Sequence, residues 1–146
     1  MIKYIEGNIF ESTAEVIVNP VNTVGIMGKG LALKFKINYP DMFEKYQEIC
    51  KKGLFKPGIL YLHTSKNKKI LLFPTKEHWK DNSKVEYVEY VEKGLIAFVN
   101  GYEKYKIKSI AFPKLGCGLG GLDWQEIKVL MDKYLEKLPI EVYIYI

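Results

Sequence analysis

The sequence predicts an α/β domain in which a mixed sheet is covered by helices on both faces. Short apolar runs, typical of buried strands, alternate along the chain with stretches of helical periodicity. The alternation is broken only in the middle, where two such runs follow one another across a polar turn. Two glycine-rich segments each follow an apolar run and lead toward a helix. Together these three observations predict the fold class.

The beginning of the chain is predicted to contain two strands and a helix. Residues 2–6 form the first strand and residues 16–18 a short buried one. The capping-box pattern between them, at residues 12–15, is too short to support more than a turn. A helix follows Gly30 and ends before Pro40, because the residue that precedes a proline disfavours helical backbone.

The middle of the chain is predicted to contain a helix and a pair of strands. A second capping-box pattern at residues 41–44 opens a helix that Gly53 ends. Residues 59–62 and 70–73 are predicted strands. The polar residues 64–69 between them predict a hairpin-like connection.

The last part of the chain is predicted to contain two helices and two strands. The capping box at residues 83–86 opens the first helix, and residues 109–112 form a strand. Residues 123–126 cap the last helix, Pro139 ends it, and residues 141–146 form the final strand. The apolar stripe of the first of these helices consists of Val85, Val88, Val91, Leu95, Phe98 and Tyr102.

The bulk composition is that of a soluble domain with an anionic partner. The 146 residues have the length of one domain, residues 1–146, and a hydrophobic fraction of 48% suffices for a core. No apolar run approaches the length of a membrane span, and no signal peptide is visible. The two cysteines are far apart in sequence, which suits a reducing cytoplasm. The net charge of +5 favours nucleotides or nucleic acid as partners.

The two glycine-rich segments are the strongest functional signal. Residues 19–32 read NPVNTVGIMGKGLA, and residues 112–121 read FPKLGCGLGG. A glycine loop between a strand and a helix leaves main-chain N–H groups free, and the helix start adds positive potential. Both segments leave strand ends, as does PTKEHW at residues 74–79, and ligands of such sheets bind beyond the carboxyl ends of the strands. Two such loops can hold a diphosphate from both sides.

Other nucleotide and metal motifs fit the sequence less well. Lys29 lacks the Ser or Thr that follows the lysine of a P-loop, and the GxGxxG pattern of the second segment lies too late for a dinucleotide-binding fold. His63 and His78 are the only histidines, and no cysteine pair has zinc spacing, so we expect neither metal nor cofactor. Cys117 is a candidate nucleophile if the loop lowers its pKa, but a small residue that fits a tight loop is the simpler interpretation.

The sequence resembles the macrodomain family and, within it, the DarG-type macrodomains. Four blocks carry the resemblance: NPVN at residues 19–22, GIMGKGLA at 25–32, FPTKEHW at 73–79 and PKLGCGLGGLDW at 113–124. The resemblance implies a three-layer sandwich with a six-stranded sheet, binding of ADP-ribose, and removal of ADP-ribose from DNA bases that a DarT-type toxin has modified. It further implies an isolated domain of a longer cytoplasmic protein.

The resemblance also assigns roles to individual residues. Lys76 matches the catalytic lysine of DarG, which acts at the anomeric carbon of the distal ribose, either as a neutral nucleophile or as a charged stabilising group. Glu77 and His78 are weaker candidates for the proton transfers. The residues implied to bind the ligand are Asn8, Ile9, Asn19, Asn22, Gly28, Lys29, Gly30, Leu31, Thr75, His78, Gly116, Cys117, Gly118, Leu119 and Gly120.

Two of these positions depart from the patterns of the family. Asn8 stands where the family usually has an aspartate that accepts from adenine, so this contact lacks charge assistance. Gly120 stands where terminal ADP-ribose glycohydrolases carry an aspartate, which argues against hydrolysis of protein-linked ADP-ribose by their route. These departures make a non-catalytic ADP-ribose-binding module one alternative. An ADP-ribose 1″-phosphate phosphatase, an activity common in the family, is the other.

Trp79 and the lysine-rich rim are candidates for the DNA side of such a site. Stacking of an aromatic side chain on a base is worth about 1–3 kcal/mol and tolerates any base. An equally favoured interpretation is that Trp79 anchors its loop to the core.

Overall fold

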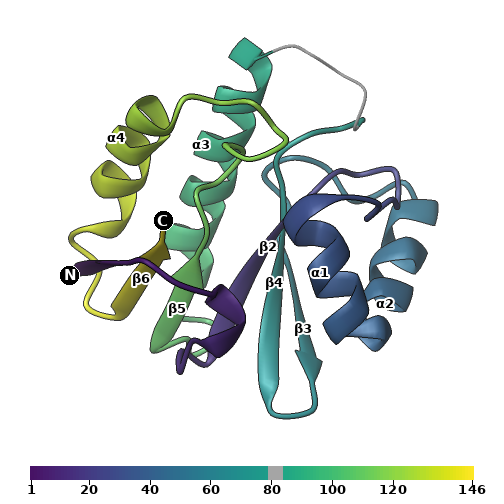
Figure 1. Cartoon of the computed structure of the whole chain (residues 1–146), viewed down its shortest axis with the longest axis horizontal. Coiled ribbons are helices and arrows are strands. Elements are labelled where there is room, and N and C mark those ends of the chain that lie inside the picture. Colours follow the sequence, from purple (N-terminus) through teal and green to yellow (C-terminus); the bar gives the residue numbers. More distant parts are fainter. Residues whose placement is uncertain (79–83) are drawn as a thin grey trace.

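The computed structural model describes residues 1–78 and 84–146, which contain a six-stranded sheet (Figure 1). Its strands are β1 (Ile2–Ile5), β2 (Val16–Val21), β3 (Tyr61–Ser65), β4 (Lys68–Pro74), β5 (Ser109–Phe112) and β6 (Glu141–Tyr145). Their order across the sheet is β1-β6-β5-β2-β4-β3, and every neighbouring pair is parallel except β3 with β4. The predicted mixed sheet is confirmed.

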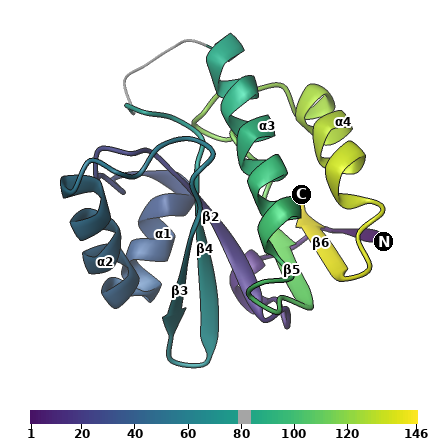
Figure 2. The ribbon, with the colours of Figure 1, turned by 180° about the vertical axis from the view of Figure 1, so that it is seen from behind.

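Helices cover both faces of this sheet. They are the short 3-10 helix η1 (Ile9–Glu11), α1 (Gly30–Asn38), α2 (Pro40–Lys51), α3 (Lys84–Gly101) and α4 (Trp124–Leu135). Figures 1 and 2 show α1 and α2 on one face and α3 and α4 on the other, and the core clusters divide in the same way. The predicted three-layer sandwich is confirmed.

The two core clusters follow the alternation of side chains along β2. Val16 and Val18 pack with α3 and α4, whereas Ile17 and Val21 pack with α1 and α2, because successive strand residues point to opposite faces. Both faces of β2 are therefore buried. This explains why its sequence is a continuous apolar run rather than an alternation of apolar and polar residues.

Strand β2 is longer than predicted. It ends at Val21 rather than Val18, so Asn19 and Pro20 are strand residues. Proline lacks the N–H group that a central strand usually needs. Here β5 pairs with only the first two residues of β2, whereas β4 pairs along its whole length, so Pro20 lies beyond the β5 ladder. The loop proper begins at Asn22.

The capping box predicted at Asp41 is wrong. Helix α2 has Tyr39 at its N-cap and Pro40 in its first turn, where the missing N–H of proline is not needed. The Asp41 carboxylate instead accepts a hydrogen bond from Ser65 Oγ (2.8 Å) and lies 2.9 Å from His63 Nε2. Asp41 thus ties α2 to β3, the strand at one edge of the sheet.

Two further local predictions are corrected. The predicted polar turn at residues 64–69 is mostly strand, because β3 extends to Ser65 and β4 begins at Lys68. Polar residues tolerate strand positions where one side of a hairpin meets water. In α3, Val85 is 74% exposed, and Tyr87 takes its place in the core. Ser83, which begins the predicted capping box, lies outside the described residues.

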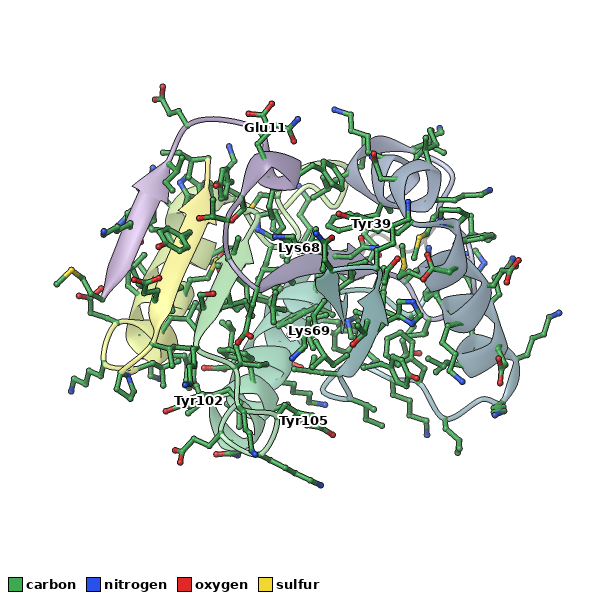
Figure 3. The ribbon with its side chains drawn as sticks, turned by 90° about the horizontal axis from the view of Figure 1, so that it is seen from below. Glu11, Tyr39, Lys68, Lys69, Tyr102 and Tyr105 are labelled. Carbon is green, nitrogen blue, oxygen red and sulfur yellow. The ribbon has the colours of Figure 1, made fainter. Side chains whose placement is uncertain are left out.

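Figure 3 shows the end of the molecule opposite to the glycine loops. Lys68 donates hydrogen bonds to Ser12 O (3.0 Å) and Ala14 O (2.6 Å), which tie the start of β4 to the chain before β2. Tyr102 and Tyr105 lie at the same end. They help to line an apolar pocket of about 150 Å³ together with Leu60, Leu62, Leu71, Ala97, Phe98, Gly101 and Ile107. None of these lining residues is a predicted site residue.

Candidate functional site

The predicted site residues gather at one edge of the sheet. β2, β4 and β5 are parallel, so their carboxyl ends lie at the same edge, toward the top of Figure 1. β2 leads into the first glycine loop (residues 22–29), β4 into residues 75–78, and β5 into the second glycine loop (residues 113–122). These three segments therefore leave the same edge of the sheet, which is where the sequence predicts the ligand to bind.

Two side chains hold the first glycine loop in shape. Asn22 Oδ1 accepts from the main-chain N–H groups of Val24 (3.1 Å) and Ile26 (3.4 Å), and Asn22 Nδ2 donates to Ile26 O (2.8 Å). The hydroxyl of Tyr46, from α2, lies 2.6 Å from Asn22 Oδ1 and 2.8 Å from Asn22 O. Burial raises the pKa of Tyr46, which keeps its hydroxyl a donor. Asn22 retains one Nδ2 hydrogen for a ligand.

The first glycine loop leads into the uncapped N-terminus of α1. Lys29, the N-cap residue, provides no side-chain cap, and Leu33 N donates to Lys29 O (3.3 Å). The N–H groups of residues 30–32 therefore lack acceptors within the helix, and none is recorded for them elsewhere in the described parts of the chain. Such a helix start carries positive potential and favours anions.

The second glycine loop is held by its own main chain. Leu122 N donates to Gly116 O (3.0 Å), which closes the loop at its base. Two tighter turns lie inside it, from Cys117 N to Lys114 O (3.1 Å) and from Gly121 N to Gly118 O (3.1 Å). Among residues 1–78 and 84–146, no acceptor is recorded for the N–H groups of residues 118–120. These three groups are available to an anion.

Gly120 is required because the second loop folds back on itself. A Cβ at Gly120 would lie 2.4 Å from Gly116 O, a main-chain atom that cannot rotate away. The loop in this conformation has no room for the aspartate of terminal ADP-ribose glycohydrolases. A Cβ at Gly118, by contrast, would meet no other atom within 4 Å.

The two loops touch one another at the start of α1. A Cβ on Gly30, whose φ is +59°, would lie 3.0 Å from Leu119 Cδ1. Leu119 is 71% exposed, so its side chain extends from the second loop to α1 across the surface. The free N–H groups of α1 and those of the second loop therefore border the same space.

The segment after β4 connects the first loop to α3. Thr75 N donates to the last carbonyl of β2 (2.9 Å), and Thr23 of the first loop donates to Glu77 O through its N–H (3.2 Å) and its hydroxyl (3.0 Å). Lys76 is half-buried between these two anchors, and its Nζ lies 5.0 Å from the centre of the Tyr87 ring in α3. The face of an aromatic ring attracts an ammonium group, so Tyr87 orients Lys76.

Comparison with known proteins decides the family. The family model for the macro domain matches residues 18–131. The chain belongs to the macro domain family. Over 150 residues, this macrodomain is 40% identical to the DNA ADP-ribosyl glycohydrolase of Thermus aquaticus and 39% identical to that of Mycobacterium tuberculosis. These alignments cover 99% of this chain but only 41% and 42% of the relatives, so the chain spans about two fifths of their length.

Solved structures show the same relationship. The macrodomain of Thermus aquaticus DarG matches with a TM-score of 0.91 at 40% identity, covering 100% of this chain and 98% of that one. Thermosipho africanus DarTG in complex with ADP-ribose matches with a TM-score of 0.91 at 42% identity, covering 99% of this chain and 41% of that one. The resemblance to DarG-type macrodomains is confirmed.

Asn8 and Ile9 follow β1 of this macrodomain. Asn8 Oδ1 accepts from Phe10 N (3.0 Å) and caps η1, a helix that the sequence analysis did not predict. The Ile9 side chain is buried in the core shared with α1, and the Phe10 ring centre lies 4.7 Å from that of Phe35. Ile9 can therefore reach a ligand only through its main chain, whereas the Asn8 side chain is exposed.

Two predicted ligand residues are buried beneath the loops. Asn19 is fully buried, with Nδ2 3.8 Å from both Met27 Sδ and Met42 Sδ. Within the described residues, its Oδ1 is the single buried side-chain polar atom without a hydrogen-bond partner. Thr75 is also buried, and His78 is half-buried. The ligand roles of these residues stay predictions, and Trp79 lies outside the described residues.

Cys117 does not have the environment of a nucleophile. Burial raises the pKa of its thiol to about 11, although the charge of nearby Lys114 acts in the opposite direction. The thiol is therefore protonated at neutral pH, and its Sγ lies 3.4 Å from Leu115 O. Cys117 fits the interpretation of a small residue in a tight loop.

Sequence reasoning missed the two tyrosines that orient site residues. Tyr46 lies inside α2 with no sequence signal that links it to Asn22. Tyr87 had a signal, because it lies four residues before Val91 and eight before Leu95, the spacing of one helix face. The predicted stripe began with Val85 instead, so the residue beneath Lys76 was overlooked.

Two further features were not found among the described residues. No group of three or more His, Cys, Asp or Glu residues among them is placed to hold a metal ion. None of the helices in the described ranges combines the length and apolar character needed to cross a membrane.

Proposed function

We propose that this macrodomain binds ADP-ribose with the diphosphate between its two glycine loops. The observation that carries the proposal is the contact of Leu119 with Gly30, because it brings the N–H groups that begin α1 next to those of residues 118–120. Main-chain N–H groups and a helix start together suit phosphate oxygens. The related Thermosipho africanus DarTG, whose structure contains ADP-ribose, supports the same choice of ligand.

We propose the remaining contacts from the resemblance to the family. The first loop and α1 supply Gly28, Lys29, Gly30 and Leu31, and the second loop supplies residues 116–120. Asn22 meets the distal ribose through its remaining Nδ2 hydrogen. Asn8 and the main chain of Ile9, which follow β1, meet the adenine.

We further propose that the protein cuts ADP-ribose from DNA bases. The relatives at 40% and 39% identity are DNA ADP-ribosyl glycohydrolases, and the net charge of +5 favours a nucleic acid substrate. In this reaction the oxygen of water bonds to C1″ of the distal ribose, and the bond from C1″ to the base breaks. The base leaves with the electron pair and takes up a proton, so ADP-ribose and the unmodified base are released.

Lys76 is the residue proposed to act at C1″. Through their main chains, its neighbour Thr75 is hydrogen-bonded to Val21 at the end of β2, and its neighbour Glu77 to Thr23 of the first loop. An ammonium held there stabilises negative charge on the departing base and can give it a proton. Glu77 and His78 are the second candidates for proton transfer, and Glu77 Oε1 accepts a hydrogen bond from Tyr90 (3.3 Å).

Release of ADP-ribose from ADP-ribosylated single-stranded DNA tests this activity. Lys76→Ala is expected to lower kcat at least about a hundredfold, while calorimetry gives an unchanged Kd for ADP-ribose. Lys76→Arg keeps the charge but not a nucleophilic amine, so partial activity in that variant supports the electrostatic role over the nucleophilic one. Lys104→Ala, an exposed lysine outside the site, is the control.

Three other outcomes would change these proposals. Binding of ADP-ribose without any release from DNA would identify a non-catalytic binding module. Release of phosphate from ADP-ribose 1″-phosphate would favour the phosphatase alternative. Wild-type turnover by Lys76→Ala would remove that lysine from the mechanism.

A DarT-type toxin is the proposed partner. The Thermosipho africanus relative at 40% identity is a DNA ADP-ribosyl transferase-DNA ADP-ribosyl glycohydrolase fusion protein, which joins the two opposed activities in one chain. A cytoplasmic location is proposed from the free thiols of Cys50 and Cys117, since that compartment keeps thiols reduced.

A further inference from the structure

Two lysines, Lys84 and Lys114, lie beside or within the second glycine loop. Lys84 begins α3, and its Cε lies 3.8 Å from the position of a Cβ on Gly121. Lys114 is exposed, and its Nζ lies 6.0 Å from the centre of the Trp124 ring at the start of α4. Leu119, in the same loop, contacts α1 instead. The second loop therefore contacts α1 through Leu119, whereas Lys84 belongs to α3 and Lys114 lies near the start of α4.

Among the described residues, no carboxylate forms a recorded ion pair with either lysine. Elsewhere, Lys45, Lys52, Lys128 and Lys133 each lie within 4.0 Å of a carboxylate. For Lys84 and Lys114 no ion pair is recorded within the described ranges. The nearby Asp123 carboxylate is engaged in capping α4, where Oδ1 accepts from Gln125 N (3.3 Å). An unpaired ammonium group is free to bind a phosphate.

We propose that Lys84 and Lys114 bind backbone phosphates of the single DNA strand that carries the ADP-ribosylated base. The inference rests on the proposed function, because it assumes that the base attached to C1″ belongs to DNA. The diphosphate occupies the α1 side of the second loop, so the strand beyond the base has the α3 and α4 side available. A base buried in a duplex would first have to be unstacked, whereas a single strand presents it directly.

Phosphate contacts have a measurable salt signature. Each lysine that neutralises a phosphate of single-stranded DNA adds about 0.7 to the slope of log affinity against log salt concentration. Two contacts therefore add about 1.4 to that slope, which makes their contribution to affinity fall about sevenfold between 50 and 200 mM salt. Binding of the ADP-ribose part through main-chain N–H groups is common to the oligonucleotide and to the isolated modified nucleoside.

The test compares two proteins, the Lys76→Ala variant and the same variant with the added changes Lys84→Ala and Lys114→Ala. Both carry Lys76→Ala so that the substrate is not consumed during the binding measurement. Fluorescence anisotropy gives Kd for an ADP-ribosylated single-stranded oligonucleotide and for the ADP-ribosylated nucleoside. The added changes are expected to weaken oligonucleotide binding about tenfold at low salt and to reduce the salt slope by about 1.4. Nucleoside binding is expected to stay the same. Lys104→Ala is the matched control, because its Nζ also lies near an aromatic ring, 5.8 Å from the centre of Tyr105, at the other end of the molecule.

The outcomes separate this inference from the function on which it rests. An unchanged oligonucleotide Kd and salt slope would overturn the phosphate contacts, even if the wild-type protein releases ADP-ribose from DNA. An equal loss of nucleoside binding would also overturn them, because it would indicate a damaged ligand site. Failure of the wild-type protein to release ADP-ribose from DNA is the separate result that removes the proposed function.

Discussion

The two glycine loops border the same space but are held in different ways. The first loop depends on side chains, since Asn22 bonds to the main chain of the loop and Tyr46 of α2 bonds to Asn22. The second loop depends on its main chain, since Leu122 N donates to Gly116 O and the chain at Gly120 passes directly over that oxygen. One loop is thus tied to its neighbouring helix, and the other is a nearly self-contained turn.

This difference determines which substitutions each loop tolerates. A Cβ on Gly28 in the first loop would meet only Ile26 Cγ2 at 3.7 Å, so the glycine itself does not hold the shape. In the second loop Gly120 is needed for the shape, because a Cβ at that position would strike main chain. The first loop should therefore be sensitive to changes of the distant side chain that supports it, and the second to a methyl group at Gly120.

The largest effect is expected from Gly120→Ala. The methyl group must displace main chain, so we expect a loss of about 1–3 kcal/mol in the free energy of unfolding. ADP-ribose affinity should also fall, because the N–H groups of residues 118–120 move. Urea unfolding and calorimetry measure the two effects. Gly118→Ala is the matched control, since its Cβ meets no atom, and equal stability of the two variants would refute the main-chain explanation.

A smaller effect is expected from Tyr46→Phe. The change removes the hydroxyl that lies 2.6 Å from Asn22 Oδ1, at a cost of about 0.5–1.5 kcal/mol in unfolding free energy. The ADP-ribose Kd should rise because Asn22 and the loop lose an anchor. Tyr39→Phe is the control, because no hydrogen bond of that hydroxyl is recorded in the part of the chain that the structure describes. If both variants bind ADP-ribose like the wild type, the hypothesis that Tyr46 supports the first loop is wrong.

The smallest effect is expected from acid. The hydrogen bond from His63 lowers the pKa of Asp41 below its ordinary value of 3.8. The pKa of Asp41 is thus lower in the folded protein than in the unfolded chain. The contact therefore stabilises the fold at pH values above the unfolded-state pKa, and this stabilisation is lost as the pH falls through the folded-state pKa. Loosening of α2 below about pH 4 should lower the protection of amides in the first loop against hydrogen exchange, relative to their intrinsic rates at each pH, before that of amides in the second loop.

Asp41→Asn provides the comparison for the acid experiment. This variant cannot titrate at residue 41, so its difference in unfolding free energy from the wild type should shrink as the pH is lowered from neutral. A difference that stays constant across the acid range would show that Asp41 does not anchor α2. An equal loss of protection against exchange in both loops would show that α2 does not support the first loop selectively.

Much of the site was predictable because its parts are local. The order of strand, glycine loop and helix follows from apolar runs and glycine positions, and Asp123 was predicted and found as the cap of α4. The predictions failed where a residue's partner lies elsewhere in the chain. Asp41 has the pattern of a helix cap, but its carboxylate is hydrogen-bonded to β3. Val85 has the spacing of a core residue, but it lies exposed in the first turn of α3.

The sequence by itself determined that two sets of main-chain N–H groups follow two strands, since strand and turn preferences act between neighbours along the chain. It also determined, through Lys76 and the blocks around it, the family to which the site belongs. Only the tertiary structure decided that Leu119 meets Gly30, that Tyr46 reaches Asn22 across 24 residues, and that Tyr87 lies beneath Lys76. These contacts depend on how helices pack on the sheet, and helix packing is set by the whole core rather than by any local pattern.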